Sequence, residues 1–377
     1  MALRAARLAR LQHPRWHVAG AGRAHRSRVA RPVVSPDRSI TDAARDIFEI
    51  HAERWRTGPE DLGSLFDECA EQGWHLLAIP EEHGGLGGTV RDLVGVLMAA
   101  GGSGVSVPIA EAHGACHAAR ISGAGMSEET AAGHVGAGLV IGDGQEEDGR
   151  HRVLVPWGRH FRAAYVLAAG GPSLLPLTPA DLSLGENLVG EPWDVMERAI
   201  EADGTAEQST AVLTRWTLLS CAKVVGAAKA VAELTVSYAN TRVQFGKPLV
   251  KFQGVSTLVA DVLAATKLAE ASLDHALCGV DAESPHTTAA VSAAKVVCST
   301  VAGDISRKAH QVHGAIGVTR EHGLHRYTRR LWAWRDELGS EDRHVGVLGN
   351  AVAEGGEEAL WELTGQLDAA GFRGAPA

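Results

Sequence analysis

The chain has 377 residues, which is enough for two or three domains with substantial cores. With 45% hydrophobic and 21% charged residues it has an ordinary soluble composition, and no apolar run reaches the roughly 18 residues of a membrane span. The net charge is -9, yet the first 36 residues hold only basic charges, so the remaining chain is strongly acidic and a poor nucleic-acid binder.

Residues 1–38 are rich in arginine and contain three prolines. They superficially resemble an organelle transit peptide, but they lack a clear amphipathic period, which favours a disordered arm or a start codon placed too far upstream. Five scattered cysteines, none in a CxxC pair, argue against a zinc cluster and a secreted disulfide scaffold. We therefore expect no metal site and a cytoplasmic location.

Three regions follow the arm. Residues 39–135 have apolar residues at helical spacing, interrupted by the glycine-rich sequence 80–88, which must be a turn. Short apolar runs between Gly, Pro and Asp clusters predict a small β-domain over residues 136–204. Apolar stripes at steps of three and four predict a bundle of long helices over residues 205–370, with a break at Pro248. The predicted fold is mainly α with a small central β-domain.

The sequence YANTRVQFGKPLVKFQ, residues 238–253, contains the break between two predicted helices. Gly246 and Pro248 end the first helix, and the next one begins near Leu249. Arg242 therefore lies beside a helix–turn–helix corner, where its planar guanidinium could bind a diphosphate. The alternative is an arginine that only caps carbonyls at the helix end.

Residues 242–246 resemble the R-x-Q-F-G signature of the acyl-CoA dehydrogenase family. Residues 311–317 resemble the family's Q-x-x-G-G-x-G motif, and residues 80–87 resemble its P-E-x-x-G-G-x-G motif. The three motifs occur in the family's order, and the resemblance covers roughly residues 40–365. It implies an N-terminal helical domain, a β-domain and a C-terminal four-helix bundle, assembled as a dimer of dimers.

The resemblance also implies an FAD that lies extended at a subunit interface. Arg242 would contact its diphosphate and Phe245 its adenine side, and three further positions would come from the neighbouring subunit: Gln311, Gly314 and Ala315. The other implied cofactor-binding positions are Gln244, Phe252, Gln253 and Ser340. Gly314 and Gly317 have a simpler alternative, which is to end a helix.

The β-region departs from the family pattern. The family usually carries a T-E-x-x-x-G-S-D loop that holds the flavin ring, and no such run occurs between residues 139 and 201. The resemblance therefore assigns no residue to the flavin ring.

The catalytic base is the second departure. Family chemistry removes a proton alpha to a thioester carbonyl, which requires a shielded carboxylate. One family position for this Glu holds Leu338 here, with Glu337 one residue early, and the other holds Trp216. Either Glu337 serves through a shifted loop, or the chain lacks a base and Glu337 is a solvated acid beside Arg335 and Arg343.

The leading hypothesis is a subunit of an FAD-dependent acyl-CoA dehydrogenase that oxidises an acyl-CoA to its 2,3-enoyl form. The resemblance implies electron-transfer flavoprotein as a partner and a homo- or heterotetramer with a homologous subunit. A non-catalytic subunit that completes the FAD site of such a partner is the first alternative. A related flavin monooxygenase or oxidase is the second, and the sequence does not specify the acyl group.

Overall fold

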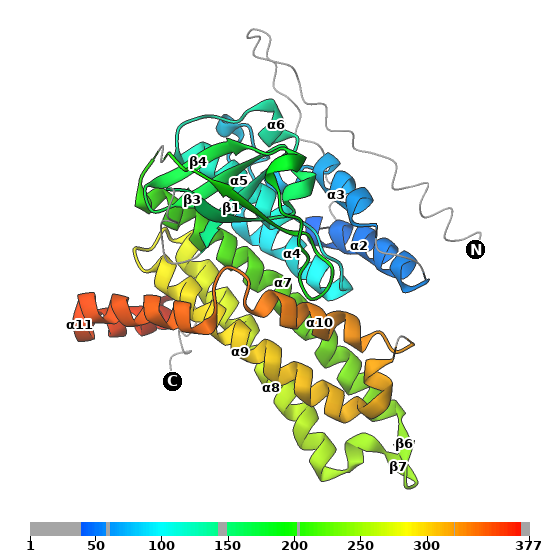
Figure 1. The fold of residues 1–377 in the computed structure, drawn as a ribbon. Helices are drawn as coiled ribbons and strands as arrows, with labels where there is room; N and C mark the ends of the chain where they lie inside the picture. Colours follow the sequence, from blue (N-terminus) through cyan, green and yellow to red (C-terminus); the bar gives the residue numbers. More distant parts are fainter. Residues whose placement is uncertain (1–38, 58–60, 142–148, 202–203, 320, 371–377) are drawn as a thin grey trace. The chain divides into compact units, whose positions relative to one another are not determined.

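The computed structural model describes residues 39–57, 61–141, 149–201, 204–319 and 321–370 (Figure 1). A first group of helices precedes the sheet, as predicted. These helices are α2 (Ile40–Thr57), α3 (Leu62–Glu71), α4 (Val90–Ser103), α5 (Ile109–Ile121) and α6 (Glu128–Ala131). They bury an apolar face that includes Phe48, Leu65 and Leu97 in the largest core cluster.

The turn predicted at residues 80–88 is confirmed. It contains a short 3-10 helix, Glu81–His83, and Gly84 adopts a positive φ of 83°. Gly85 has no space for a side chain, because a Cβ there would lie 2.0 Å from the carbonyl oxygen of Ile79. The chain then enters α4 through Thr89, whose side chain and backbone N–H form a capping box with Asp92.

Five strands form one sheet with the order β4-β3-β1-β2-β5. Only β1 and β3 pair in parallel, and the other neighbours are antiparallel. The strands are β1 (Val135–Ile141), β2 (His151–Pro156), β3 (Ala163–Ala168), β4 (Gly171–Pro176) and β5 (Trp193–Arg198). The apolar runs predicted the first four, whereas β5 was missed because its buried position 194 is an aspartate.

The second helical group begins with the 36-residue helix α7 (Ala206–Thr241). It continues with α8 (Gln253–Asp281), α9 (Thr287–His313), α10 (Leu324–Arg335) and α11 (Glu341–Ala370), in which Gly356 is non-helical. Residues 287–318, essentially α9, are long and apolar enough by composition to cross a membrane. Since 67% of the apolar window is buried inside the protein, α9 is a core helix of the bundle.

Helices α4 and α7 approach each other at two glycines. A Cβ on Gly101 would lie 2.1 Å from the carbonyl oxygen of Lys223, and one on Gly226 would lie 2.1 Å from that of Met98. The two backbones are therefore in direct contact. This contact fixes the position of α7 at Lys223.

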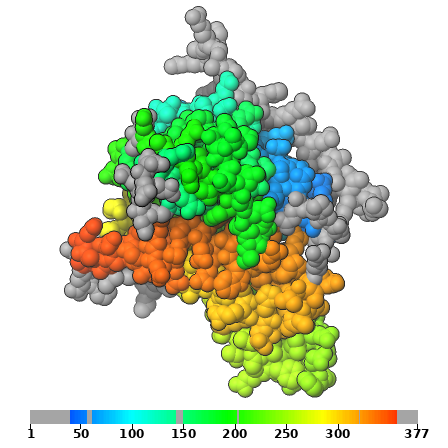
Figure 2. Space-filling view, in the orientation of Figure 1, coloured from blue at the N-terminus to red at the C-terminus, as the bar shows by residue number. Residues whose placement is uncertain are grey.

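Strands β3 and β4 contact α7 of the second helical group, and the segment before β5 contacts α10. Arg329 on this helix donates a hydrogen bond to the carbonyl of Leu188, which precedes β5. In the space-filling view the orange atoms of α10 and α11 adjoin the green atoms of the β-region (Figure 2). The predicted fold class is confirmed: two helical groups flank a small sheet. The domain boundaries at residues 135/136 and 204/205 stay predictions, and the arm 1–38 lies outside the described residues.

Candidate functional site

The predicted site residues form two groups at different positions along α7. The first group, here called the hairpin end, lies where α7 and α9 end and α8 begins; it comprises Arg242, Gln244, Phe245, Phe252, Gln253, Gln311, Gly314 and Ala315. The second is centred on Glu337, which contacts Ser220 and Lys223 of α7. With a rise of 1.5 Å per residue, Lys223 and Arg242 lie about 30 Å apart along the helix.

A two-stranded hairpin stands where a helix–turn–helix corner was predicted, formed by β6 (Val243–Gln244) and β7 (Lys247–Pro248). The two residues of its turn, Phe245 and Gly246, have φ values of 49° and 78°, as a tight two-residue hairpin requires. A left-handed conformation is unfavourable for phenylalanine, and this side chain is 91% exposed. An exposed aromatic side chain on a strained turn indicates a contact outside this chain.

Basic and aromatic groups surround the hairpin. The rings of Phe245 and Phe252 meet edge to face with centroids 6.1 Å apart, and the Lys247 ammonium lies 4.4 Å from the Phe252 ring. Arg242 is exposed at the C-terminus of α7, and no hydrogen bond or ion pair joins its guanidinium to another residue that the structure describes. At this surface the Arg242 guanidinium is available to bind an anion, and the exposed Phe245 ring is available to pack against a planar ring.

The ends of α7 and α9 meet through a ring stack. Tyr238 and His313 have centroids 4.5 Å apart and planes 20° apart, and His322 packs edge-on against both rings. The Arg242 and Gln311 motifs therefore lie at the same end of one chain. Within the described ranges no group of three or more His, Cys, Asp or Glu side chains is arranged to hold a metal ion.

A cavity of about 370 Å³ lies beside the end of α9. Its lining includes three predicted residues, Gln311, Gly314 and Ala315, together with Arg307 and Trp332. Gly314 has a φ of 62°, and no atom lies within 4 Å of the position of a Cβ there. The glycine does end the helix, as the simpler alternative proposed, and it also leaves its backbone open to a ligand.

Glu337 is buried, with 5% of its surface exposed. Its Oε2 accepts a hydrogen bond from Ser220 Oγ at 2.9 Å and pairs with Lys223 Nζ at 2.9 Å. The interpretation of Glu337 as a solvated acid beside Arg335 and Arg343 is therefore wrong. The chain reverses at Leu338, whose φ is 61°, and this turn leaves Glu337 inside.

Lys223 lies among three carboxylates. Its ammonium is 2.9 Å from Glu337, 4.0 Å from Glu111 Oε1 and 5.2 Å from the centroid of the Trp334 ring. Burial lowers the pKa of Lys223, but Glu337, Glu111 and Glu191 raise it above its ordinary value, so the amine stays protonated. We call Glu111, Glu191, Glu337 and Lys223 the charged cluster.

Glu111 of α5 is the least satisfied member of the charged cluster. Burial raises its pKa to about 7, with Lys223 opposing and Glu337 adding to the shift. Its Oε2 has no hydrogen-bond partner in the part of the chain that the structure describes. Glu111 therefore changes its charge near neutral pH, and an acid that titrates there can exchange a proton under physiological conditions.

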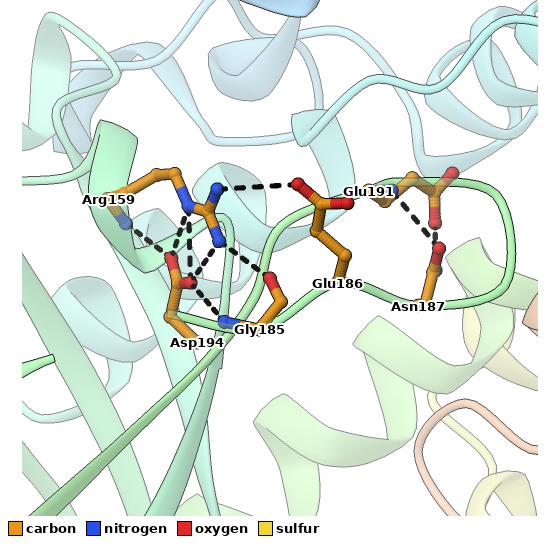
Figure 3. A network of polar contacts seen from close by, with 6 residues as sticks. All are labelled: Arg159, Gly185, Glu186, Asn187, Glu191 and Asp194. Carbon is orange, nitrogen blue, oxygen red and sulfur yellow. Dashed lines mark hydrogen bonds and ion pairs between the residues drawn. The ribbon is translucent and has the colours of Figure 1, made fainter. Parts of the chain in front are cut away.

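A polar network holds the segment before β5 (Figure 3). Asp194 is fully buried and accepts hydrogen bonds from Arg159 Nη2 at 2.7 Å and from the backbone N–H of Gly185 at 3.2 Å. Arg159 also donates to the carbonyl of Gly185 and lies 3.8 Å from Glu186. The Asp194 carboxylate thus holds Gly185, at the start of this segment, against β5 at its end.

The same segment positions Glu191 in the charged cluster. Asn187 Oδ1 accepts a hydrogen bond from the backbone N–H of Glu191, which shapes the turn between them (Figure 3). The Glu191 carboxylate accepts a hydrogen bond of 2.9 Å from Trp334 Nε1 of α10. Glu191 thereby joins the β-region to the second helical group.

The end of α10 is held on α9 just before Glu337. Lys295 Nζ donates to the carbonyls of Trp334 and Arg335, each at 3.0 Å, and Ser299 Oγ donates to Arg335 at 2.7 Å. These donors cap carbonyls that lack partners within the helix. Ser340 is exposed at the entry to α11 and belongs to neither the hairpin end nor the charged cluster.

Two family models match separate parts of the chain. The acyl-CoA dehydrogenase N-terminal domain matches residues 37–142, and the acyl-CoA dehydrogenase C-terminal domain matches residues 203–353. The chain belongs to the acyl-CoA dehydrogenase family. This family consists of flavoprotein oxidoreductases, and its members generally bind FAD.

Curated members of the family match at modest identity. Acyl-CoA dehydrogenase FadE34 of Mycobacterium tuberculosis is 28% identical over 340 residues, which is 84% of this chain and 45% of FadE34. Acyl-CoA dehydrogenase IpdE2 of Mycolicibacterium smegmatis is 25% identical over 72% of this chain and 82% of its own length. The chain thus spans less than half of FadE34.

Solved acyl-CoA dehydrogenase structures share the fold. The Tcur3481-Tcur3483 steroid ACAD superposes with a TM-score of 0.71 at 23% identity, covering 84% of this chain and 97% of that one. The ChsE4-ChsE5 complex from Mycobacterium tuberculosis gives 0.69 at 22% identity, covering 84% and 98%. Butyryl-CoA dehydrogenase from Megasphaera elsdenii gives 0.69 at 19% identity with the same coverage.

Sequence reasoning missed two residues that decide the surroundings of Glu337 in this member of the family. Lys223 lies in the apolar sequence LLSCAKVVGAA, and a lone lysine on a helix that is buried all round indicates a paired interior charge. Glu111 opens α5 in a similarly apolar run. Because Lys223 and Glu111 are far from Glu337 in the sequence, the sequence alone does not indicate that the three residues lie together.

Proposed function

We propose that this chain is a non-catalytic subunit of a heteromeric acyl-CoA dehydrogenase that completes the FAD site of a homologous partner. The single observation that carries the proposal is the ion pair between Glu337 and Lys223. A base must present a free carboxylate to the α-carbon of the thioester. Here Glu337, the carboxylate next to the family's base position, is neutralised by an ammonium 2.9 Å away.

The hairpin end fits the adenine and diphosphate half of FAD. Arg242 would bind the diphosphate, and Phe245 and Phe252 would lie on the adenine side, with Gln244 and Gln253 beside them. Gln311, Gly314 and Ala315 line a cavity at the same end, so we propose that all eight residues of one chain face one cofactor, rather than that these three come from the neighbouring subunit. Bound FAD would accept the hydride from the β-carbon of the acyl group.

A second subunit is needed because the two groups are far apart. Lys223, which pairs with Glu337, lies about 30 Å along α7 from Arg242. The sequence of the β-region contains no flavin-ring motif. We propose that the partner supplies the base and the flavin-ring contacts. The Tcur3481-Tcur3483 steroid ACAD and the ChsE4-ChsE5 complex, each named as a pair, support this assembly.

The test compares two substitutions in the complex formed with the homologous partner. Glu337→Gln should leave acyl-CoA turnover within about twofold, whereas Arg242→Ala should lower the FAD content of the purified complex. Complete loss of turnover in Glu337→Gln would mean that this chain supplies the base.

A complete acyl-CoA dehydrogenase that acts through Glu337 is the second candidate. It is favoured by the burial of Glu337 in the turn next to the family's base position. It requires Lys223 to leave the carboxylate when substrate binds. Reduction of FAD by an acyl-CoA with the isolated chain would establish this candidate, and oxygen consumption without acyl-CoA turnover would indicate an oxidase instead.

Electrons would leave the assembly through an electron-transfer flavoprotein. A relative that is 30% identical over 28% of this chain is named as subunit CarC of a caffeyl-CoA reductase-Etf complex. We propose the same kind of acceptor here and a cytoplasmic location. Ser340 is proposed to lie near the cofactor of the opposite half-site, away from the hairpin end of its own chain.

A further inference from the structure

We infer that Lys223 closes the space in front of Glu337 against an acyl chain, so that this subunit binds no acyl-CoA thioester. The inference rests on the proposed function and adds to it the residue that excludes the substrate. It makes Lys223 a determinant of which subunit in the assembly receives the thioester.

The position of the ammonium is the first argument. A carboxylate that removes an α-proton must contact the acyl chain, so the substrate has to lie directly against Glu337. In this chain Ser220 Oγ and Lys223 Nζ already lie 2.9 Å from Glu337 Oε2. An acyl chain and the Lys223 side chain cannot occupy that volume together.

Buried side chains surround the ammonium. Glu111 and Trp334 lie near it and are 1% and 0% exposed. The backbone of α7 is also held close to α4, because a Cβ on Gly101 would lie 2.1 Å from the carbonyl oxygen of Lys223. A shift of α7 that carried Lys223 away from Glu337 would therefore disturb this helix contact.

Electrostatics reinforces the steric argument. If Lys223 moved out to admit an apolar chain, the Glu337 carboxylate would stay in an apolar surrounding without its cation. Uncompensated buried charges are strongly unfavourable. The charged cluster therefore resists the exchange that substrate binding would require, whereas a small neutral residue at position 223 together with a neutral residue at position 337 would permit it.

Isothermal titration of the full chain with octanoyl-CoA and butyryl-CoA, with FAD in the buffer, tests the inference. The double substitution Lys223→Ala with Glu337→Gln removes both the side chain and the charge left behind. We expect it to bind at least one of the two thioesters about tenfold more tightly than the unmodified chain. Lys229→Ala on the same helix, which removes a half-exposed lysine paired with Glu270, is the matched control and should bind like the unmodified chain.

Lys223→Ser combined with Glu337→Gln is the second variant, in case the first double variant does not fold. It opens the same space and should change the affinity in the same direction. Equal affinity of the unmodified chain and the folded variants for both thioesters would overturn the inference. The FAD content of the complex with the homologous partner reports on the proposed function separately, since a complex whose FAD content is unchanged by Arg242→Ala contradicts the half-site and leaves the thioester result intact.

Discussion

Tyr238 and His313 stack with ring centroids 4.5 Å apart and thereby join the end of α7 to the end of α9. Burial lowers the pKa of His313, and it lowers that of its neighbours His310 and His322 as well. The two motifs that we propose to bind FAD therefore meet through a contact between a tyrosine and a neutral imidazole.

The first prediction concerns the pH dependence of this contact. A histidine whose folded pKa is lowered leaves stability unaffected above its unfolded pKa and costs stability as the pH falls below it, because only the unfolded chain takes up the proton. His313→Phe keeps the stack and should reduce the loss in free energy of unfolding between pH 7.5 and 5.5, measured by urea denaturation. Substitution of exposed His83 by Phe is the control, and equal pH slopes for all three proteins would contradict the prediction.

The second prediction concerns Glu111, whose pKa of about 7 in the folded chain exceeds the ordinary glutamate value of 4.5. An acid whose pKa is raised in the folded chain contributes stability that is present below pH 4.5 and lost as the pH rises through 7. Glu111→Gln should therefore be more stable than the unmodified chain at pH 8, by on the order of 3 kcal/mol, and gain little near pH 4.5. Exposed Glu128→Gln is the control, and a stability difference independent of pH would refute the assignment.

The third prediction concerns the coupling of Lys223 and Glu337. Lys223→Met leaves the buried Glu337 carboxylate without its cation and should lower the free energy of unfolding by about 3–5 kcal/mol. Adding Glu337→Gln should restore much of that loss, because the uncompensated charge is then gone. A double-mutant cycle by chemical denaturation measures the coupling, and strictly additive effects would show that the pair is not a unit.

The fourth prediction concerns Phe245 at the hairpin tip. Asparagine tolerates the left-handed conformation better, so Phe245→Asn should raise the free energy of unfolding by about 1 kcal/mol. The same substitution removes the aromatic ring and should weaken FAD binding by the assembled complex about tenfold. Val243→Thr on the same hairpin keeps the shape of an exposed side chain and should change neither quantity, and unchanged FAD binding in Phe245→Asn would remove Phe245 from the half-site.

The sequence predicted most of the fold because apolar periodicity and glycine turns are local signals. The stripe along α9 and the turn at residues 80–88 are both readable from neighbouring residues. Strand β5 was missed because Asp194 is a buried charge whose partner, Arg159, lies 35 residues away. The hairpin β6–β7 was missed because a left-handed phenylalanine is rare, so nothing local indicated a two-residue strand reversal there.

Site residues were predictable from the sequence only where they belong to a recognisable family motif. The resemblance to family motifs assigns residues 242–246 and 311–315 to a cofactor, which stays a prediction, and the structure brings both segments to one end of the chain. The state of Glu337 was not predictable, since it depends on Lys223, which lies 114 residues earlier, and on a turn at Leu338. Buried charge pairs between distant segments leave no periodic signal in a sequence.

Helix α7 connects the charged cluster to the hairpin end. It is one uninterrupted helix of 36 residues, so by its rise per residue it is a rod about 54 Å long. Its middle is pinned to α4 at Gly101 and Gly226, and its tip carries the exposed hairpin. The pinned middle and the exposed tip belong to one rod, so α7 holds the hairpin at a fixed distance of about 30 Å from Lys223.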